Sequence, residues 1–498
     1  MSKQIVILGA GPAGLMAAWE LNQAGYQVTI LERENFVGGM CATQTFQGKK
    51  GEYRFDYGGH RFITKNLKLL QFVDELMTDD LLYAERTSVI RFKGRTYNYP
   101  LAIGNLLRNA PLSLLAGAAV DLVFKLPFQK RPTEQSTSNF AEWIETRFGN
   151  TLYKNFFEGY TGKLWGIDPR QLSADWASQR ISLLDLKDVA RRLIPTRGAT
   201  PRTYAKKYRY PKLGFGQLYT KLAEKLQAQG VVIIQGANIT DLERSASCIT
   251  AVTYELAGNT QSISCDNVVA TIPLPVVCTL TGFNSDLSYR SLRFFNMPMA
   301  TENISQNTWQ YLSDPELLGT RLQEPRRRSP FMAPVGETSV MIEIPCNKGD
   351  DIWHMDNTKL LQRVKQDLDH LNVPDVSTGE FFTTYTEYAY PMMDVSYNAK
   401  REAAIDHLAQ FDNLVMTGRQ GTFRYIFTDT AMEMGLMAAE GIIKGIDNRR
   451  EIFDHRNEKT VIEVQSIMDE DNIGQDTRSV KNNSIVNKKG SGEEKNVT

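Results

Sequence analysis

The sequence of 498 residues is poor in cysteine and histidine, with five of each. The cysteines are odd in number and never stand in a CxxC spacing, which argues against a zinc ribbon and a disulfide framework. The histidines form no ligand spacing with one another, so we expect no metal site. Scattered, reduced thiols are typical of the cytosol, and we therefore expect a cytoplasmic protein. The cysteines are residues 41, 248, 265, 278 and 346, and the histidines are residues 60, 354, 370, 407 and 455.

The sequence also lacks an excess of charge of either sign, because 57 Lys and Arg residues balance 57 Asp and Glu residues. Nucleic-acid-binding proteins usually carry a basic surplus, so we expect no nucleic acid as a partner. The motifs GxSxG, HExxH and the P-loop are absent, which weighs against hydrolases and kinases. The chain is too long for one simple core, and we expect about two lobes.

Long hydrophobic runs are scarce. The one candidate, residues 110–128, is near membrane-spanning length, but Asp121 and Lys125 interrupt it and prolines flank it. We predict a buried helix of a second domain there. A helix in peripheral contact with a membrane surface is the alternative, and a true membrane span is the least favoured. The N-terminal run MSKQIVILGAGPAGL predicts a first strand and not a signal peptide.

A dinucleotide-binding fingerprint opens the chain. The run QIVIL at residues 4–8 predicts a strand, Gly9, Gly11 and Gly14 form GxGxxG, a helical pattern follows, and a second strand ends at Glu32. In this strand–turn–helix context the glycines allow a tight turn and bring a pyrophosphate to the positive end of the helix. Glu32 is placed to accept hydrogen bonds from a ribose 2′-OH and to repel a 2′-phosphate. Further candidate contacts of the cofactor are Pro12, Ala13 and Arg33.

A second glycine pair favours FAD over NAD as the dinucleotide. Gly38 and Gly39 follow Glu32 within a few residues, at the place where FAD proteins run a glycine pair beside the pyrophosphate and ribityl chain. No second GxGxxG stands in a strand–turn–helix context. We therefore expect one FAD and no separate nicotinamide domain.

The stretch FDYGGHRFIT, residues 55–64, contains a third glycine pair. Gly58 and Gly59 precede His60 and Arg61. Adjacent glycines let the backbone approach a flat or bulky group, because no Cβ is in the way. The residues alone leave the role of His60 open.

Five blocks of this sequence resemble the flavin amine oxidase superfamily, and within it the branch of UDP-galactopyranose mutases and protoporphyrinogen-oxidase-like proteins. They extend from residue 5 to about residue 438, so over nearly the whole ordered chain. The second, third and fifth blocks are the specific ones. The blocks read VILGAGPAGLMAAWEL…VTILERENFVGG, FDYGGHRFITKN, FFEGYTGKLWGIDPRQLSADWASQRI, YPKLGFGQL and TGRQGTFRYIFTDTAMEMGLMAA.

The resemblance implies a place for the residues of the second block. A Tyr-Gly-x-His loop lies against the isoalloxazine ring in this branch, so Gly58 and Gly59 are expected to bring backbone against the flavin. His60 is expected near the N5 side, where it contacts the flavin or handles a proton, and a structural hydrogen bond is the alternative. Arg61 is a candidate anion clamp for the substrate, with an intramolecular salt bridge as an equal alternative.

The fifth block is expected to close the flavin site. The resemblance implies that Gly418 and Arg419 end a buried strand and that Asp429 begins the last helix. The positive end of that helix is expected at the flavin N1/O2 edge. Ala431 and Met432 are further expected contacts of the cofactor. On the adenine side, the resemblance implies a contact from Ile239.

The third block is expected on the substrate side. It places Tyr160, Lys163 and Trp165 close together, and in the mutases this segment borders the substrate cleft. Aromatic faces beside polar groups suit a sugar or a nucleotide, so we take Tyr160 and Trp165 as candidate catalytic residues beside His60 and Arg61. The alternative is that these aromatic side chains are helix core.

The sequence departs from the mutases at two places. Their diphosphate-binding arginine follows the third block, where this chain has Arg180 and then Leu183 and Leu184, and their second loop histidine is replaced by Ile63. We therefore expect first a FAD-dependent oxidoreductase that takes a hydride from an unidentified small molecule. The alternatives are a mutase, which isomerises a sugar nucleotide through reduced-flavin N5, and a flavoprotein without turnover. The electron acceptor and the oligomeric state cannot be read from the sequence.

The predicted fold is α/β, with a discontinuous Rossmann-like FAD-binding domain, a mixed α+β substrate domain and a helical insertion. The FAD-binding domain is expected from residues 1–100, 208–280 and 406–455. The substrate domain is expected from residues 101–207, which are mainly helical, and residues 281–405. The polar tail at residues 456–498 is expected to be disordered.

Overall fold

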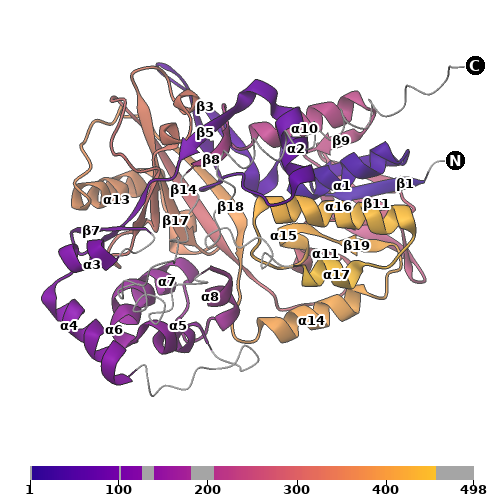
Figure 1. Ribbon diagram of the computed structural model, residues 1–498. Helices are drawn as coiled ribbons and strands as arrows, with labels where there is room; N and C mark the ends of the chain where they lie inside the picture. Colours follow the sequence, from indigo (N-terminus) through magenta and orange to yellow (C-terminus); the bar gives the residue numbers. More distant parts are fainter. Residues whose placement is uncertain (1–2, 100–102, 126–138, 181–206, 456–498) are drawn as a thin grey trace, which may run out of the picture.

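A computed structural model of the chain describes residues 3–99, 103–125, 139–180 and 207–455. The predicted tail at 456–498 and the leucines at positions 183 and 184 lie outside the described residues. The described part contains two large sheets, with helices packed on both (Figure 1). This α/β architecture, assembled from discontinuous segments, confirms the predicted fold class.

A parallel five-stranded sheet with the order β19-β13-β1-β2-β9 forms the first lobe. Every residue of the central strand β1 from Ile5 to Leu8 is fully buried, as expected for a strand covered on both faces. Its strands come from three distant parts of the chain, which agrees with the predicted discontinuous lobe. They are β1 (Gln4–Leu8), β2 (Gln27–Glu32), β9 (Val232–Gln235), β13 (Asn267–Ala270) and β19 (Leu414–Met416).

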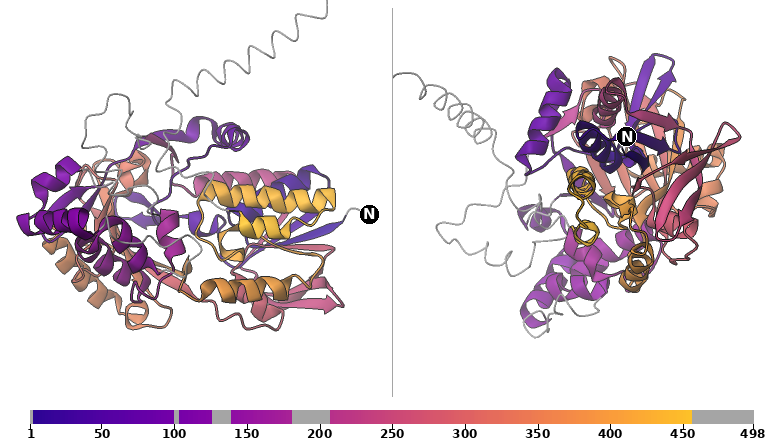
Figure 2. Two further views of the ribbon diagram at one scale, coloured as in Figure 1. Left: turned by 60° about the horizontal axis from the view of Figure 1, so that its bottom comes forward. Right: turned by 90° about the vertical axis from the view of Figure 1, so that its right-hand side faces the viewer.

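Helices α1 (Pro12–Gln23) and α16 (Thr428–Lys444) lie side by side against this sheet (Figures 1 and 2). Gly435 allows this close approach, because a Cβ there would come within 2.2 Å of the backbone oxygen of Ala13. The resemblance placed Asp429 at the start of a helix, and α16 begins one residue earlier, at Thr428.

A seven-stranded sheet with the order β18-β14-β17-β16-β15-β6-β7 forms the second lobe. All its pairs are antiparallel except β15 with β6. Helix α13 (Asn357–His370) packs its buried leucines and valine on the residues of one face. The strands are β6 (Ser88–Phe92), β7 (Arg95–Asn98), β14 (Tyr289–Met299), β15 (Trp309–Leu312), β16 (Arg321–Gln323), β17 (Thr338–Cys346) and β18 (Phe382–Pro391).

Strands β6 and β7 differ from the expected boundary. The sequence analysis assigned residues 1–100 to the FAD-binding domain, but these two strands hydrogen-bond into the seven-stranded sheet. The pairing of Ser88 with Trp309 joins segments far apart in the chain, and no local pattern reveals such a pairing. Domain boundaries drawn from sequence blocks therefore miss this crossover.

Three smaller sheets complete the strands. One is the antiparallel sheet β10-β11-β12, and the other two are antiparallel pairs, β3 with β4 and β5 with β8. These strands are β3 (Thr43–Gly48), β4 (Gly51–Asp56), β5 (Leu81–Glu85), β8 (Lys207–Pro211), β10 (Asn238–Ser245), β11 (Cys248–Leu256) and β12 (Asn259–Ser264).

Short helices fill the segment between residues 103 and 180, drawn in purple and magenta in Figure 1. They are α3 (Ile103–Asn109), α4 (Leu112–Val120), the π-helical turns η3 (Asp121–Lys125) and η4 (Tyr153–Phe157), α5 (Phe140–Phe148), α6 (Asn150–Leu152), α7 (Glu158–Trp165) and α8 (Ala174–Arg180). The remaining described helices of α type are α2 (Leu67–Met77), α10 (Gln217–Ala228), α11 (Leu274–Leu280), α12 (Asp351–His354), α14 (Tyr397–Leu408), α15 (Gly418–Gly421) and α17 (Arg449–Asp454).

The apolar stretch at 110–128 corrects an expectation. We predicted a buried helix, but α4 is buried at Leu114 only, while Leu112 is 84% and Phe124 is 68% exposed. The helix contacts its neighbours along one narrow face. At its C-terminal end, buried Asp121 accepts a hydrogen bond from the backbone N–H of Thr151 at 2.6 Å. Residues 126–128 lie outside the described part. Among the described helices, none is both long and apolar enough to cross a bilayer.

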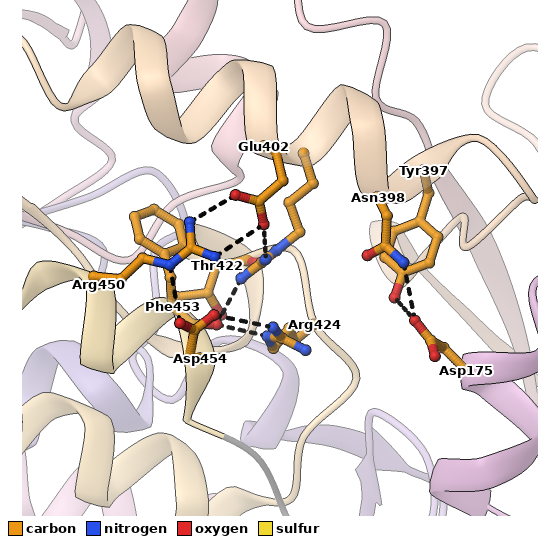
Figure 3. A network of polar contacts seen from close by, with 10 residues as sticks. Asp175, Tyr397, Asn398, Glu402, Thr422, Arg424, Arg450, Phe453 and Asp454 are labelled. Atoms are coloured by element: carbon orange, nitrogen blue, oxygen red, sulfur yellow. Dashed lines mark hydrogen bonds and ion pairs between the residues drawn. The ribbon is translucent and has the colours of Figure 1, made fainter. Parts of the chain in front are cut away.

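Buried arginines join the C-terminal helix to the loop that precedes α16 (Figure 3). Arg401 of α14 donates from Nε to the oxygen of Thr422 at 2.8 Å and from Nη2 to the oxygen of Phe453 at 2.6 Å. Arg424 Nε donates to the same Phe453 oxygen at 2.7 Å. The carbonyl end of α17 therefore meets two cations, which is favourable at a helix C-terminus. These contacts hold the 418–429 segment in place from behind.

Two contacts also join the helical segment to α14 (Figure 3). The carboxylate of Asp175 in α8 accepts hydrogen bonds from the Tyr397 hydroxyl at 2.5 Å and from Asn398 Nδ2 at 3.1 Å. Burial and the adjacent carboxylate raise the pKa of Tyr397 well above its usual value, so the hydroxyl stays protonated and donates. The helical segment is thereby anchored on the side of the second lobe that faces α14.

Candidate functional site

A cavity of about 730 Å³ lies between the two large sheets. One part of its wall comes from the carboxyl ends of the parallel strands β1, β2 and β13, where open α/β sheets bind their ligands. The other part comes from the strands and loops of the seven-stranded sheet. The two parts are described in turn.

The β1–α1 turn shows three glycines with different tasks. Gly9 has a φ of +101°, and a Cβ there would lie 2.5 Å from Thr271 Oγ1. A Cβ at Gly14 would lie 2.1 Å from the backbone oxygen of Gly9, so Gly14 is required for packing and does not line the cavity. Gly11 lines the cavity, and a Cβ there meets no described atom within 4 Å. The absence of a side chain at Gly11 therefore keeps the cavity open and is not required by the packing of the turn.

Glu32 stabilises this turn from the end of β2. Its Oε2 accepts a hydrogen bond from the backbone N–H of Ala10 at 2.7 Å, and its Oε1 accepts one from the backbone N–H of Glu34 at 2.9 Å. Burial raises the pKa of Glu32, and these two backbone donors oppose that rise. The carboxylate lines the cavity, as expected for a ribose acceptor, and each oxygen keeps a further lone pair.

The second glycine pair lies against the first. Gly38 and Gly39 both have positive φ values, 99° and 51°, and a Cβ at Gly39 would lie 3.5 Å from the Cα of Gly11. Gly39 lines the cavity, whereas Gly38 turns the chain beside it. Arg33 also lines the cavity, with its guanidinium 5.7 Å from the ring of Tyr388. Pro12, Ala13 and Ile239 are among the lining residues too.

The fifth block contributes the start of α16 and the loop before it. Gly418 has a φ of +74°, and a Cβ there would meet the Cβ of Ala13 at 2.7 Å. Asp429 is fully buried, and neither carboxyl oxygen has a hydrogen-bond partner of standard geometry among the described residues. Burial raises the pKa of Asp429 to about 7. Ala431 lines the cavity, while Met432 is buried behind it.

His60 lines the cavity as a neutral imidazole. Burial lowers its pKa to about 4, and its ring stacks on Phe215 with the centroids 5.3 Å apart. Its Nε2 lies 3.0 Å from the carbonyl oxygen of Tyr57. Because a carbonyl only accepts, Nε2 carries the proton and Nδ1 is left as an acceptor. His60 therefore makes the structural hydrogen bond that was the alternative, and its Nδ1 keeps a lone pair.

The glycine pair before His60 lies over a buried polar network. A Cβ at Gly58 would come within 3.4 Å of Glu343 Oε1, and one at Gly59 within 3.3 Å of Gln323 Oε1. Glu343 accepts a charged contact from Arg321 Nη2 at 2.6 Å. The glycines thus bring the loop close to the seven-stranded sheet as well as to the cavity, a second reason for the absence of side chains.

The substrate-side wall is built from aromatic rings and guanidinium groups. Trp309 and Tyr311 are two residues apart on β15, so their side chains lie on the same face of the strand, and both line the cavity. Tyr311 is the direct cross-strand partner of Arg321. Arg61 lines the cavity, as predicted. The sequence analysis missed Arg86, Trp309, Tyr311, Arg321, Tyr390 and Tyr425. Tyr425 lies inside the fifth block and could have been found there, whereas Arg86 lies in the loop before β6 and the others lie in strands that share no local motif.

Arg419 connects the two walls. It lines the cavity, its Nη2 donates to the oxygen of Ala389 at 2.7 Å, and its guanidinium lies 4.1 Å from the ring of Tyr425. Such a stacked arginine keeps its charge and its orientation. Arg419 was expected as a cofactor contact, and its position at the meeting of both lobes agrees with that expectation.

Two predicted substrate residues lie apart from the cavity wall. Trp165 is 1% exposed and packs edge-on against Trp176 with the centroids 4.8 Å apart. Tyr160 is partly buried behind Tyr311, with the ring centroids 6.1 Å apart. Neither is among the residues that line the cavity. For Trp165, the burial supports the alternative of a helix core, because its ring is used to join α7 to the second lobe.

Lys163, beside Trp165, is also structural. Its Nζ donates to four backbone oxygens, those of Leu312, Asp314, Leu317 and Gly319, at 2.8 to 3.2 Å. An ammonium group has three donors, so this cage saturates it. Lys163 therefore fixes the loop that joins β15 to β16, and it holds the cavity wall from behind.

A comparison with protein families identifies the family to which the chain belongs. The model of the family described as flavin containing amine oxidoreductase matches residues 12–443. The chain belongs to this family. Most of the described fold lies inside the matched range, and of the residues that line the cavity only Gly9 and Gly11 precede it.

Curated relatives of known name match parts of the chain. The probable UDP-galactopyranose mutase of Klebsiella pneumoniae is 27% identical over 173 residues, which are 35% of this chain and 44% of the relative. The dTDP-fucopyranose mutase of Escherichia coli is 28% identical over 171 residues, and again 44% of the relative is covered. The chain thus spans less than half the length of these two relatives. Phytoene dehydrogenase of Streptomyces griseus is 26% identical over 406 residues, 69% of this chain and 72% of the relative.

Solved structures share the fold over most of the chain. The reduced UDP-galactopyranose mutase has a TM-score of 0.75 and 20% identity, and the match covers 91% of this chain and 96% of that one. The protoporphyrinogen oxidase candidate from Exiguobacterium sp. 255-15 has a TM-score of 0.68 and 16% identity, with 89% and 98% covered. These similarities confirm the resemblance predicted from the five blocks, and at this level of identity they establish the fold.

FAD is the cofactor of this family, as the sequence predicted. The residues of this cavity fit it. The β1–α1 turn offers a space without Cβ atoms at Gly11 and Gly39, and Glu32 lies at the ribose end. At the other end, the oxygens of the buried Asp429 carboxyl have no hydrogen-bond partner of standard geometry among the described residues, so they suit a polar ligand such as the hydroxyls of a ribityl chain or a flavin edge.

Proposed function

We propose that this chain is a FAD-dependent oxidoreductase that oxidises a small molecule by hydride removal. The single observation that carries the proposal is the continuous cavity, which joins the dinucleotide-binding turns to a wall of aromatic and arginine side chains. FAD held in this cavity would supply the two-electron chemistry. The remaining chemistry belongs to the side chains of this chain.

His60 suits a role as a proton acceptor in this site. Its low pKa keeps the imidazole neutral at physiological pH, so Nδ1 is available to accept a proton or a hydrogen bond. The Nε2 bond to Tyr57 holds the ring in one tautomer, and the stack on Phe215 limits its rotation. A hydride donor with a hydroxyl or an amino group must also lose a proton, and His60 is the neutral base at this end of the cavity.

The aromatic wall positions the substrate and displaces water from it. Trp309, Tyr311 and Tyr390 present flat apolar faces to the cavity, and Arg321 is held among them by Glu343 and by the Tyr390 hydroxyl at 2.9 Å. A substrate that stacks on such faces is desolvated and oriented before reaction. Planar or sugar-like molecules suit this wall better than flexible aliphatic chains.

A mutase that isomerises a sugar nucleotide without net redox change is the second candidate. It is favoured by the TM-score of 0.75 to the reduced UDP-galactopyranose mutase. The first candidate is preferred because Ile63 occupies the place of the second loop histidine that the resemblance implies for the mutases. A flavoprotein without turnover is the third candidate, and the open cavity at His60 argues against it.

The test starts with the purified protein, which we expect to be yellow with one FAD per chain. Mixing it without oxygen with a panel of sugar nucleotides, polyamines, porphyrinogens and polyenes should bleach the oxidised flavin for one class. A colourless protein that binds NAD and does not take up added FAD would overturn the cofactor assignment. Isomerisation of a sugar nucleotide only after reduction by dithionite, with the flavin state unchanged, would establish the mutase instead.

We also propose a partner besides the substrate, namely a membrane surface. The exposed apolar side chains of Leu112, Val123 and Phe124 on α4 and the π-turn after it suit a peripheral contact with a membrane. Flotation with anionic vesicles tests that contact. Double replacement of Leu112 and Phe124 by Ser should abolish flotation and leave the FAD content unchanged.

A further inference from the structure

A seam of polar side chains leads from the cofactor end of the cavity to a partly exposed histidine. It lies between the first turns of α16 and the turn at residues 64–66 that enters α2. Its members are Asp429, which lines the cavity, and Thr64, Asn66, Glu433 and His455. The chemistry proposed for His60 uses none of these side chains.

Asp429 is the inner end of the polar seam. Its side chain is fully buried at the cavity wall, and its oxygens have no hydrogen-bond partner of standard geometry among the described residues. Burial raises its pKa to about 7, an effect that the charge of Glu433 adds to and the Thr64 hydroxyl opposes. Burial and neighbouring acidic groups, Asp429 among them, raise the pKa of Tyr219 in α10 well above its usual value, so this neighbour stays neutral.

Glu433 and His455 are the outer part of the polar seam. Glu433 lies one helical turn after Asp429 on the same face of α16, where Cβ atoms four residues apart are about 5–6 Å from each other. Its Oε1 accepts a hydrogen bond from Asn66 Nδ2 at 2.9 Å, and its Oε2 lies 3.4 Å from His455 Nε2. The side chains of Glu433 and His455 are 17% and 25% exposed, so the seam reaches solvent here.

The turn at residues 64–66 joins the two carboxyl groups of the polar seam. The Thr64 hydroxyl oxygen accepts a hydrogen bond from the backbone N–H of Asn66 at 3.1 Å, which leaves the hydroxyl proton to be donated toward Asp429. The side-chain oxygen of Asn66 accepts from the backbone N–H of Leu69 at 3.2 Å, and its amide nitrogen donates to Glu433. A row of polar groups thus extends without interruption from the cavity to the surface.

We propose that Asp429, Glu433 and His455 form a proton-exchange path that connects the cofactor end of the cavity with solvent. The inference rests on the proposed function, because removal of a hydride from a substrate also leaves a proton to be released. In that reaction a C–H bond and an O–H or N–H bond of the substrate break. The hydride takes both electrons of the C–H bond to the flavin, and the electron pair of the other bond forms the new double bond of the product.

The path carries the proton of the O–H or N–H bond. His60 has a pKa of about 4 and Asp429 one of about 7, so a proton that His60 takes from the substrate is held more tightly by Asp429. Both residues line the same cavity. From Asp429 the proton passes to Glu433 across a gap that one water molecule spans, and His455 releases it to solvent.

The experiment uses the FAD-loaded protein and needs no substrate. Its flavin absorbance is first titrated with pH, and we expect a change with a midpoint near pH 7 that Asp429→Asn removes. A temperature jump at the midpoint, in a buffer whose pH changes with temperature, then displaces the equilibrium. The relaxation rate of the absorbance reports how fast Asp429 exchanges its proton with solvent.

Variants locate the path. Glu433→Gln keeps an acceptor for Asn66 but carries no proton, so relaxation should slow by at least about tenfold. His455→Ala should slow it as well, and added imidazole should restore the rate, because the free base replaces the lost ring. Glu440→Gln and His354→Ala are the matched controls: both residues are exposed, lie outside the cavity lining and should leave the rate unchanged. Rates are compared at the midpoint of each variant, since Glu433 also raises the pKa of Asp429.

Unchanged relaxation in both Glu433→Gln and His455→Ala would overturn the path and leave the polar seam as a structural contact. A titration of which no part depends on Asp429 would overturn it too. Melting curves and FAD content are recorded for each variant, so a folding defect is not mistaken for slow exchange. A protein that takes up no FAD would refute the proposed function instead. The infrared band of the protonated Asp429 carboxyl, identified by its loss in Asp429→Asn, then follows the same exchange without cofactor.

Discussion

The two walls of the cavity are built in different ways. On the first lobe, the wall consists of backbone and glycines, and Gly9, Gly11 and Gly14 lie within six consecutive residues of the chain. On the second lobe, the wall consists of side chains such as Trp309 and Tyr390, which come from strands distant in sequence. Recognition by backbone needs a local turn, and recognition by side chains needs a complete sheet.

This difference explains why the glycine turn could be predicted from the sequence and the role of Trp165 could not. A glycine motif fixes its own geometry, because the turn, the strand and the helix are neighbours. An aromatic residue in a helix carries no such information, and Trp165 illustrates this: its segment resembles a substrate segment, yet its ring is core.

The largest effect is expected for Trp165→Ala. Removing a ring that is 1% exposed leaves a cavity between α7 and the second lobe, and such truncations cost about 3–5 kcal/mol of unfolding free energy. Urea denaturation measures the loss. The KM of the remaining folded enzyme should stay the same, and Trp165→Phe should lose far less stability. A strongly raised KM with unchanged stability would return Trp165 to the substrate wall.

Asp429→Asn should remove a pH dependence of the stability. The folded pKa of about 7 lies above the ordinary value of 3.8, so the unfolded chain releases this proton first as the pH rises. The protein freed of FAD therefore loses stability between pH 4 and pH 7, by at most about 4 kcal/mol from this group. The Asn variant should not show that loss. Urea denaturation midpoints at pH 5 and pH 8 measure this loss of stability. An equal change of the midpoint with pH in both proteins would contradict the raised pKa of Asp429.

Gly14→Ala and Gly11→Ala should separate folding from cofactor binding. A Cβ at Gly14 would collide with the backbone oxygen of Gly9 at 2.1 Å, and overpacking of this kind costs about 1–3 kcal/mol. A Cβ at Gly11 meets open space, so the protein freed of FAD should keep its melting temperature while its affinity for FAD falls. Equal behaviour of the two variants in both measurements would show that the turn does not divide these tasks.

The smallest effect is expected for Arg450→Met. This side chain is 58% exposed and pairs with Glu402 and Asp454 at the surface (Figure 3), so its loss should cost below about 1 kcal/mol. Arg401→Met is the comparison, because that buried group donates to two backbone oxygens and its loss leaves them unpaired. Denaturation of both variants at low and high salt checks the order. A larger loss of unfolding free energy in Arg450→Met than in Arg401→Met would mean that surface charges, and not buried donors, hold the 418–429 segment.

Much of the cofactor wall could be predicted. The turn glycines, Glu32 and the Gly38–Gly39 pair lie where local patterns placed them, and α16 begins beside Asp429, where the resemblance placed a helix start. These features are local, or they depend on one helix that meets one turn. The exposed face of α4 could not be predicted in the same way, since the composition of a helix does not state which neighbours cover it.

The dinucleotide turn could be read from the sequence, because it depends on residues a few positions apart whose spacing dictates the backbone, and the five blocks carried the resemblance that implied the family and FAD. The crossing of β6 into the second lobe, the carbonyl cage of Lys163 and the meeting of Arg61 and Arg86 at Trp309 became visible in the folded chain alone. The reason is physical. Strand pairing joins residues by hydrogen bonds between backbones, which are the same for every residue type, so the partners are selected by the packing of the whole core.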